Sequence, residues 1–206
     1  MEPRPSKIVA IGRNYSDHVA ELGDRQAPQR PRIFFKPPSS LVSSGQHIVI
    51  PRESQRVEHE AELAVVIGRR MRRVSAADAL GYVSGYAAAN DVTARDLQKL
   101  ENLPDFAKSF DTFCPLGQVA AADGVDPADL LIECRVNGDL RQSGRTSAML
   151  TPLPELLAHI AAAMTLEPGD VVLTGTPAGV GPLVAGDSVE VRISGLPVLV
   201  SPVRSE

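Results

Sequence analysis

Tryptophan is absent from this sequence, and cysteine and aromatic residues are scarce. Cys114 and Cys134 are the only cysteines among 206 residues, which excludes the disulfide framework of many small secreted proteins and favours reduced thiols in the cytoplasm. Phe, Tyr and Trp together make up 4% of the chain, whereas 16 Gly and 17 Pro are spread along it. This composition predicts several short strands joined by tight turns.

A long hydrophobic segment and a basic run are also missing. No stretch approaches the roughly 18 apolar residues of a membrane span, and the N-terminal MEPRPSKIVAIGRNY reaches Arg and Asn too early for a signal peptide. The formal net charge of -4 argues against nucleic acid as the main partner. We therefore expect a cytoplasmic protein whose partners include neither a membrane nor a nucleic acid.

The remaining composition suits one soluble domain, expected over residues 1–206, because 43% of the residues are hydrophobic and 22% are charged. Periodicity and turn residues predict more strands than helices, and therefore an α+β fold. Asn137-Gly138 is the strongest hairpin signal and lies within 131–144. Further strands are expected at 7–12, 32–37, 47–51, 62–68, 85–93, 170–177 and 187–194. Helices are expected at 14–23, capped by Asn14 or Ser16, at 74–83, capped by Ser75, and at 153–170.

Three glutamates occupy every second position at the start of VEHEAELAVVIG, residues 57–68. Side chains two apart on a strand share a face, so Glu58, Glu60 and Glu62 are expected to point the same way. Asp91 ends a second apolar strand about 30 residues later. If the two strands are neighbours, the carboxylates meet, and their repulsion favours a bound proton or cation. Oxygen ligands suit Mg²⁺, with Mn²⁺ or Ca²⁺ as alternatives. A solvated strand face is the competing interpretation.

Other polar residues fall in the first expected helix or in apolar segments. His18 and Glu21 lie at i and i+3, where a carboxylate raises the basicity of an imidazole; a surface helix pair is the alternative. Lys36 and Lys108 are single cations in aromatic stretches, able to neutralise a substrate carboxylate or an enolate, or to extend to solvent. The loop LTGTPAGVG at 173–181 lacks the Gly-Lys-Ser/Thr ending of a nucleotide-binding loop, which leaves an anion nest or a plain turn.

Seven stretches of the sequence together resemble the fumarylacetoacetate hydrolase family. One such motif would be a weak signal, whereas seven in the family's order across nearly the whole chain are specific. The stretches are GRNYSDHVAELG (12–23), FFKP (34–37), HEAELAVVIG (59–68), GYAAANDVTARDLQ (85–98), AKSFDTFCPLG (107–117), VNGDLRQ (136–142) and LTGTPAGVGP (173–182).

The resemblance implies a metal site, a fold and an assembly. In the family, the Glu-x-Glu pair and the Asp before Val-Thr-Ala-Arg-Asp hold a divalent ion, usually Mg²⁺, and these positions are Glu60, Glu62 and Asp91 here. Glu58 is thereby left outside the ligand set and is expected to be dispensable. The implied fold is a mixed β roll, or barrel-like core, with a few flanking helices. The implied assembly is a homodimer.

The resemblance also implies roles for residues around the ion. Lys108 corresponds to the family lysine near the metal and the substrate, and Thr176 corresponds to a substrate-carboxylate contact. His18 and Glu21 correspond to the pair that orients and deprotonates water. Further implied pocket residues are Arg13, Tyr15, Lys36, Arg95 and Gln98.

The implied activity is metal-dependent hydrolysis of a C–C bond in a small 2-oxo acid of the acylpyruvate type, such as fumarylpyruvate or acetylpyruvate, through a metal-bound pyruvate enolate. Isomerisation of 2-hydroxyhepta-2,4-diene-1,7-dioate and decarboxylation of oxaloacetate, in aromatic catabolism, are alternatives that share the enolate. A non-enzymatic domain stabilised by its ion is a third. The segment KLENLPDFAK at 99–108 lacks the Trp of many relatives' lids, and Phe106 is its candidate replacement.

Overall fold

The apolar run that follows the alternating glutamates forms strand β6 (Ala61–Ile67), whose side chains are all buried. β6 pairs antiparallel with β7 (Val83–Asn90) on one side and with β13 (Val171–Leu173) on the other. A strand that is covered on both faces favours apolar side chains, which explains the hydrophobic run from Leu63 to Ile67. Glu60 precedes this strand, and Glu62 is its second residue.

Around β6, the computed structural model builds an eight-stranded mixed sheet from the described residues, 3–23 and 26–206. Residues 1–2 and 24–25 of the expected domain lie outside the described residues. The strand order is β2-β1-β13-β6-β7-β9-β3, and β10 pairs with β7. The strands not yet placed are β1 (Ile8–Gly12), β2 (Arg32–Lys36), β3 (Leu41–Ser43), β9 (Cys114–Leu116) and β10 (Ala120–Ala121).

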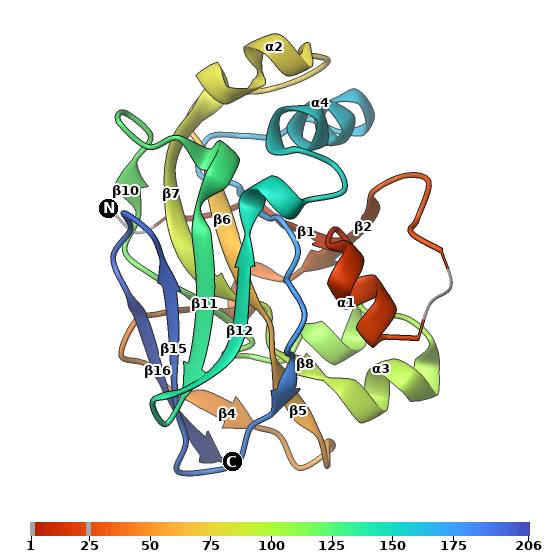
Figure 1. The fold of residues 1–206 in the computed structure, drawn as a ribbon, viewed down its shortest axis with the longest axis vertical. Coiled ribbons are helices and arrows are strands. Elements are labelled where there is room, and N and C mark those ends of the chain that lie inside the picture. The colour runs from red at the N-terminus through yellow and green to blue at the C-terminus, as the bar shows by residue number, and fades with distance from the viewer. Residues whose placement is uncertain (1–2, 24–25) are drawn as a thin grey trace.

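A second sheet packs against the first, and the main hydrophobic core fills the space between them (Figure 1). Its order is β12-β11-β15-β16-β4. The predicted hairpin is confirmed: Asn137 and Gly138 have φ values of 54° and 88°, the paired positive angles of a tight type I′ turn. The strands of this second sheet are β4 (Ile48–Ile50), β11 (Leu131–Val136), β12 (Asp139–Arg145), β15 (Ser188–Ile193) and β16 (Leu199–Ser205). A short sheet joins β5 (Val57–His59), β8 (Thr93–Ala94) and β14 (Gly181–Pro182). The α+β class and the curled β core are confirmed.

Helices lie at the ends and one side of the sheets. The bounds are α1 (Ser16–Glu21), α2 (Ala76–Ala79), α3 (Arg95–Glu101) and α4 (Leu153–Ala163). Figure 1 shows α2 beside α4 above the sheets, whereas α1 and α3 lie on the side of β8. Among the described residues, no helix is long and apolar enough to cross a membrane.

All three helix predictions need correction in their bounds, and one helix is unexpected. The helix expected at 74–83 is α-helical only at Ala76–Ala79 and continues as a 3-10 turn at Leu80–Tyr82. The expected helix 153–170 ends at Ala163, because Met164 is extended and Leu166 pairs with Met71 in an isolated bridge. The first helix is shorter than 14–23, and Tyr15 is its N-cap, without a side-chain cap. Ser75 does cap α2, accepting a hydrogen bond from the Asp78 amide. Helix α3 was not predicted from the sequence.

The expectation that three glutamates share one strand face is wrong for Glu58. β5 ends at His59 and β6 begins at Ala61, and the two strands belong to different sheets. The chain changes sheet at Glu60, so the alternation of one strand does not extend across it. Glu58 instead lies buried at the start of the short sheet, where it pairs with Arg56 and Arg95.

Candidate metal centre and active site

Three carboxylates meet where β6 and β7 lie side by side. Ala61 is paired with Asn90 in the register, so the residues that flank these two, Glu60, Glu62 and Asp91, are neighbours. The Asp91 amide donates to the Glu60 carbonyl at 2.8 Å. One carboxylate oxygen from each acid lies within 4.8 Å of the others, and all three side chains are buried. The structure therefore brings together the cluster that the sequence predicts.

The electrostatics of this cluster fit a hard divalent cation. Burial, together with the charges of Asp91 and Glu60, raises the pKa of Glu62 well above its usual value. Burial also acts to raise the pKa of Glu60, but the charges of Lys108 and Arg95 outweigh it and hold that pKa below its usual value. Buried carboxylates this close are stable only when one of them is protonated or when positive charge lies beside them. Oxygen donors alone suit Mg²⁺, Mn²⁺ or Ca²⁺.

Two lysines approach the cluster from distant segments of the chain, Lys36 from the end of β2 and Lys108 from the 3-10 turn Phe106–Lys108. Lys108 Nζ donates to Glu60 at 2.9 Å, to Asp91 at 2.6 Å and to Thr93 Oγ1 at 2.7 Å. Lys36 is entirely buried, with Nζ 2.7 Å from Asp91 Oδ1 and 2.5 Å from the carbonyl oxygen of Lys108. Lys36 thus ties the backbone of the Lys108 segment to Asp91, whereas Lys108 contacts two of the three acids directly.

Arg95, the first residue of α3, connects the cluster to the helix. Its guanidinium donates to Glu58 at 2.6 Å, to Gln98 at 2.5 Å and to Glu60. A planar guanidinium presents several donors in a fixed geometry, so these contacts orient Glu60 relative to α3. The expected pocket residues Arg95 and Gln98 are therefore adjacent to each other and to the acidic cluster.

His18 and Glu21 form the pair that the helix spacing predicts. His18 Nδ1 lies 2.9 Å from Glu21 Oε2, and Glu21 Oε1 accepts from the Gly179 amide at 2.9 Å. Because the carboxylate is an acceptor, Nδ1 carries the hydrogen, and Nε2 keeps its lone pair in the neutral imidazole. Nε2 makes no hydrogen bond within the described residues. The positive charge of a protonated His18 would lower the pKa of Glu60, which places the imidazole near the cluster.

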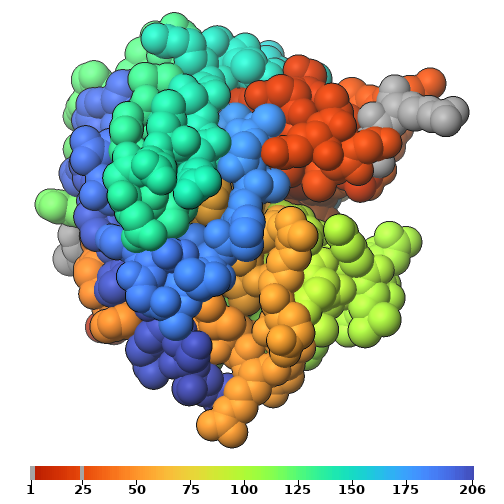
Figure 2. All heavy atoms as spheres, turned by 60° about the horizontal axis from the view of Figure 1, so that its bottom comes forward, coloured from red at the N-terminus to blue at the C-terminus, as the bar shows by residue number. Residues whose placement is uncertain are grey.

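A hollow lies between the two helices that carry these residues. Figure 2 shows it between the red segment that includes α1 and the yellow-green segment that includes α3. His18 reaches Glu60 electrostatically from the α1 side, and Arg95 hydrogen-bonds Glu60 from the α3 side. The exposed apolar side chains of Leu100, Leu103 and Phe106 lie on the α3 side. The acidic cluster is thus approached between the two helices.

The remaining expected pocket residues come from the loop after β13 and from the segment before α1. The Gly175 amide donates to Glu62 at 2.7 Å, and Thr176 Oγ1 donates to the Ala61 carbonyl at 2.8 Å. The Tyr15 hydroxyl is buried without a hydrogen-bond partner in the described chain, and burial, with the charge of Glu62, raises its pKa. Arg13 is half-buried and has a left-handed backbone with φ of 61°.

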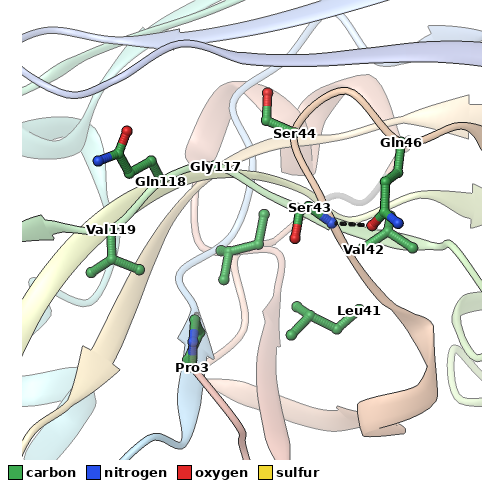
Figure 3. A pocket seen from close by; sticks show the side chains of 10 residues that line it. Pro3, Leu41, Val42, Ser43, Ser44, Gln46, Gly117, Gln118 and Val119 are labelled. Carbon is green, nitrogen blue, oxygen red and sulfur yellow. Dashed lines mark hydrogen bonds between the residues drawn. The ribbon is translucent and has the colours of Figure 1, made fainter. Parts of the chain in front are cut away.

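One well-formed cavity is separate from this chemistry. It has a volume of about 390 Å³ and lies between residues 41–46 and 116–119 (Figure 3). Its lining side chains are neutral, and Figure 3 shows the Ser43 amide donating to Gln46 at its rim. A cavity without a titratable or metal-ligating group offers no acid, base or ion site, so the acidic cluster is the better candidate.

Two buried amides next to the cluster were missed in the sequence. Asn90 Oδ1 accepts from the Glu60 amide at 2.9 Å, and Gln142 Oε1 accepts from the Ala61 amide at 2.9 Å. Both hold the backbone of the acidic segment. No sequence signal marks Gln142, because a regular hairpin would pair Cys134 with Arg141, and the irregularity between Cys134 and Arg135 shifts that pairing to Gln142.

Comparisons with known proteins identify similar sequences. Residues 7–204 match the family described as fumarylacetoacetate (FAA) hydrolase, C-terminal. A mitochondrial oxaloacetate tautomerase of Bos taurus is 43% identical over 194 residues, which cover 92% of this chain and 87% of the relative.

Solved structures also share the fold. The 5-carboxymethyl-2-hydroxymuconate delta-isomerase of Mycobacterium smegmatis superposes with a TM-score of 0.92 at 43% identity, over 99% of this chain and 78% of that chain. The fumarylpyruvate hydrolase of Pseudomonas aeruginosa, solved with Mn²⁺ and pyruvate, superposes with a TM-score of 0.92 at 30% identity, over 98% of this chain and 91% of that chain.

Proposed function

This chain belongs to the fumarylacetoacetate hydrolase family, and on that premise we propose that it is a divalent-metal-dependent hydrolase of acylpyruvate-type 2,4-dioxo acids. The similar proteins include a hydrolase, an isomerase and a tautomerase. The observation that carries the proposal is the buried acidic cluster beside a histidine whose tautomer leaves a free lone pair. We further propose a cytoplasmic homodimer whose only other partner is a small 2-oxo acid.

Glu60, Glu62 and Asp91 would hold the ion, proposed as Mg²⁺ with Mn²⁺ or Ca²⁺ as alternatives. Three protein carboxylates leave coordination positions for substrate oxygens. The bound ion would supply positive charge next to the 2-oxo oxygen, where negative charge develops as the C–C bond breaks. The Pseudomonas aeruginosa hydrolase, solved with Mn²⁺ and pyruvate, supports this assignment by similarity.

The chain's own residues would bind the substrate on both sides of the cluster. The Thr176 hydroxyl donates to Ala61 and accepts from Gln142, so the donor left for a substrate carboxylate at this residue is its backbone amide. Lys108, with Nζ next to two of the acids, would balance the negative charge of the leaving enolate. Arg13, Tyr15 and Gln98 are proposed pocket residues.

His18 would act as the general base. Its Nε2 takes a proton from a water molecule, whose oxygen attacks the distal carbonyl carbon of the substrate. The C–C electron pair then moves to the 2-oxo group, and pyruvate leaves as its enolate. The proton held on Nε2 returns to C3 of the enolate, so protons balance. Glu21, itself held by the Gly179 amide, keeps the imidazole oriented through both proton transfers.

Oxaloacetate tautomerisation is the second candidate, and the 43% identity to the Bos taurus tautomerase over 92% of this chain favours it. That reaction only moves a proton between C3 and the 2-oxo oxygen, and the free lone pair of His18 can also take up the C3 proton. Dienoate isomerisation and oxaloacetate decarboxylation use the same enolate. A domain in which the ion is purely structural would show none of these activities.

A substrate panel tests the proposal. Acetylpyruvate, fumarylpyruvate and oxaloacetate are each incubated with purified protein and Mg²⁺, with and without a chelator, and loss of the enol absorbance and release of pyruvate are followed. We expect pyruvate from an acylpyruvate only when the ion is present. Enol–keto exchange of oxaloacetate without pyruvate release would select the tautomerase instead. No ion-dependent change of any substrate would overturn both candidates.

A further inference from the structure

The side chain of Gln142 on β12 is fully buried, yet no step of the proposed reaction uses it. Its Oε1 accepts from the Ala61 amide at 2.9 Å and from His59 Nδ1 at 3.0 Å. Its Nε2 donates to Thr176 Oγ1 at 2.7 Å and to the Pro177 carbonyl at 2.8 Å. All four hydrogen-bonding positions of the amide are therefore used.

The orientation of this amide is set by its partners. The Ala61 N–H can only donate and the Pro177 carbonyl can only accept, so the oxygen and nitrogen of Gln142 cannot exchange places. With Oε1 as acceptor, His59 Nδ1 must carry its hydrogen. A buried polar network with every member satisfied is rigid, because any rearrangement leaves an unpaired group in the core.

Ala61 lies between Glu60 and Glu62, and both its backbone N–H and its carbonyl are held by hydrogen bonds. Its N–H donates to Gln142, and its carbonyl accepts from the Thr176 hydroxyl, which Gln142 also holds. β13 ends at Leu173. Beyond it, the hydroxyls of Thr174 and Thr176 donate hydrogen bonds to backbone carbonyls of β6. Gln142 thus closes a three-part link between the acidic segment, the 174–177 loop and the hairpin.

The hairpin and the loop are in close contact at this point. A Cβ at Gly144 would lie 2.5 Å from Pro177 Cβ, so only glycine allows β12 to approach the loop this closely. Little space is left for Gln142 to adopt another rotamer. The link is therefore rigid in its packing as well as in its hydrogen bonds.

We propose that Gln142 is a positioning residue of the metal site: it sets the separation of Glu60 and Glu62 and the position of Thr176 relative to them. This inference rests on the proposed function, because it concerns the same ion. The competing explanation is that Gln142 only stabilises the hairpin. The two differ in whether ion affinity depends on the hydrogen bonds themselves.

Calorimetric titration of Mn²⁺ into chelator-treated protein, without substrate, separates these explanations. The variants are Gln142→Met, which keeps the length but removes the amide, Thr176→Val, which removes the hydroxyl, and the double variant. Val136→Ala, which shortens a core side chain of the same hairpin, is the control for general loss of stability. Urea midpoints of all proteins are measured alongside, so that folding is known for each.

We expect Gln142→Met and Thr176→Val each to weaken Mn²⁺ binding about tenfold, the usual size of an outer-shell effect. Because both act through one link, the double variant should bind about as weakly as the weaker single variant, rather than a hundredfold less tightly. Thr176→Ser, which keeps the hydroxyl, should restore affinity, and Val136→Ala should bind like wild type. If Gln142→Met does not fold, the contrast between Thr176→Val and Thr176→Ser tests the same link.

The outcomes distinguish failure of the positioning role from failure of the proposed function. Tight Mn²⁺ binding by wild type together with unchanged binding by Gln142→Met and Thr176→Val would overturn the positioning role and leave the proposed function intact. Independent, multiplying losses in the double variant, or an equal loss in Val136→Ala, would also overturn it. Failure of wild type to bind Mn²⁺ would overturn the proposed function and this inference together.

Discussion

Replacing Lys108 with methionine tests whether positive charge stabilises the acidic cluster. In the structure, Lys108 Nζ donates to Glu60 at 2.9 Å, to Asp91 at 2.6 Å and to Thr93 at 2.7 Å, and its side chain is 4% exposed. Removing one partner of a buried ion pair costs about 3–5 kcal/mol, because it leaves the other charge buried and unpaired. We expect a loss of that size for Lys108→Met in urea unfolding at pH 7 with a chelator present.

Mn²⁺ should change this result, since a bound divalent cation supplies the missing charge. At a free concentration of 100 times Kd, an ion adds about 2.7 kcal/mol to the stability of the protein that binds it. Lys108→Met should bind Mn²⁺ more tightly than wild type, because a like charge has been removed from two of the ligands. Both proteins gain stability from the ion, so at saturating Mn²⁺ the deficit should shrink by RT ln of the ratio of the two Kd values, about 1.4 kcal/mol if the variant binds tenfold more tightly.

A second lysine paired with a buried carboxylate, Lys7, provides a matched control. Lys7 pairs with the buried carboxylate of Asp170 at 2.5 Å, and neither residue belongs to the acidic cluster. Lys7→Met should lower the free energy of unfolding equally with and without Mn²⁺. If Lys108→Met shows the same deficit under both conditions, as the control should, then charge balance at an ion site is not what Lys108 provides.

Three further substitutions have specific expected outcomes. His18→Ala should lower kcat for acylpyruvate hydrolysis about 10²–10⁴-fold while Mn²⁺ affinity measured by calorimetry stays unchanged; normal hydrolysis would refute its role as base. Burial acts to raise the pKa of Asp170, but hydrogen bonds from Lys7, Glu167 and Ser6 outweigh it and lower that pKa. The ionised Asp170 therefore stabilises the folded protein fully above the ordinary carboxyl range, and this stabilisation is lost as pH falls through the folded pKa. Asp170→Asn should therefore lower the free energy of unfolding by about 2 kcal/mol at pH 7, a deficit that narrows below about pH 4; a pH-independent deficit in urea titrations would contradict this. Gly179→Ala should cost about 1–3 kcal/mol and reduce kcat through Glu21, because φ is 100° and the added Cβ would lie 2.1 Å from the Arg141 carbonyl; wild-type melting and kcat would refute it.

The parts of the fold that the sequence predicts are those with local signals. Asn137-Gly138 determines its own turn, because both residues tolerate positive φ, and the run 63–67 in β6 has no polar residue to place it at a surface. The meeting of Glu60, Glu62 and Asp91 follows from strand ends once β6 and β7 are neighbours. The pairing of His18 with Glu21 follows from helical spacing.

The parts that could not be predicted depend on long-range contacts. Strict alternation across Glu58 and Glu60 suggests one strand, but the chain changes sheet at Glu60, which only the partners of β5 determine. α4 stops at Ala163 because Leu166 finds a bridge partner 95 positions away in Met71. Gln142 resembles any surface glutamine until the hairpin is folded onto the 174–177 loop.

The prediction that Glu58 is dispensable now has a structural context. Glu58 is outside the acidic cluster, in agreement with its expected absence from the ligand set. It is nevertheless buried, and it holds the guanidinium of Arg95 that also reaches Glu60. Sequence spacing identifies which acids can converge, but it does not show which of the others the converging ones depend on.

The central claim is that Glu60, Glu62 and Asp91 bind one divalent ion, and a calorimetric titration of Mn²⁺ into chelator-treated wild type and Glu62→Gln tests it most directly. We expect wild type to bind one ion per chain and the variant, which stays folded by urea unfolding, to lose that binding. No binding by wild type, or equal binding by both proteins, would contradict the account.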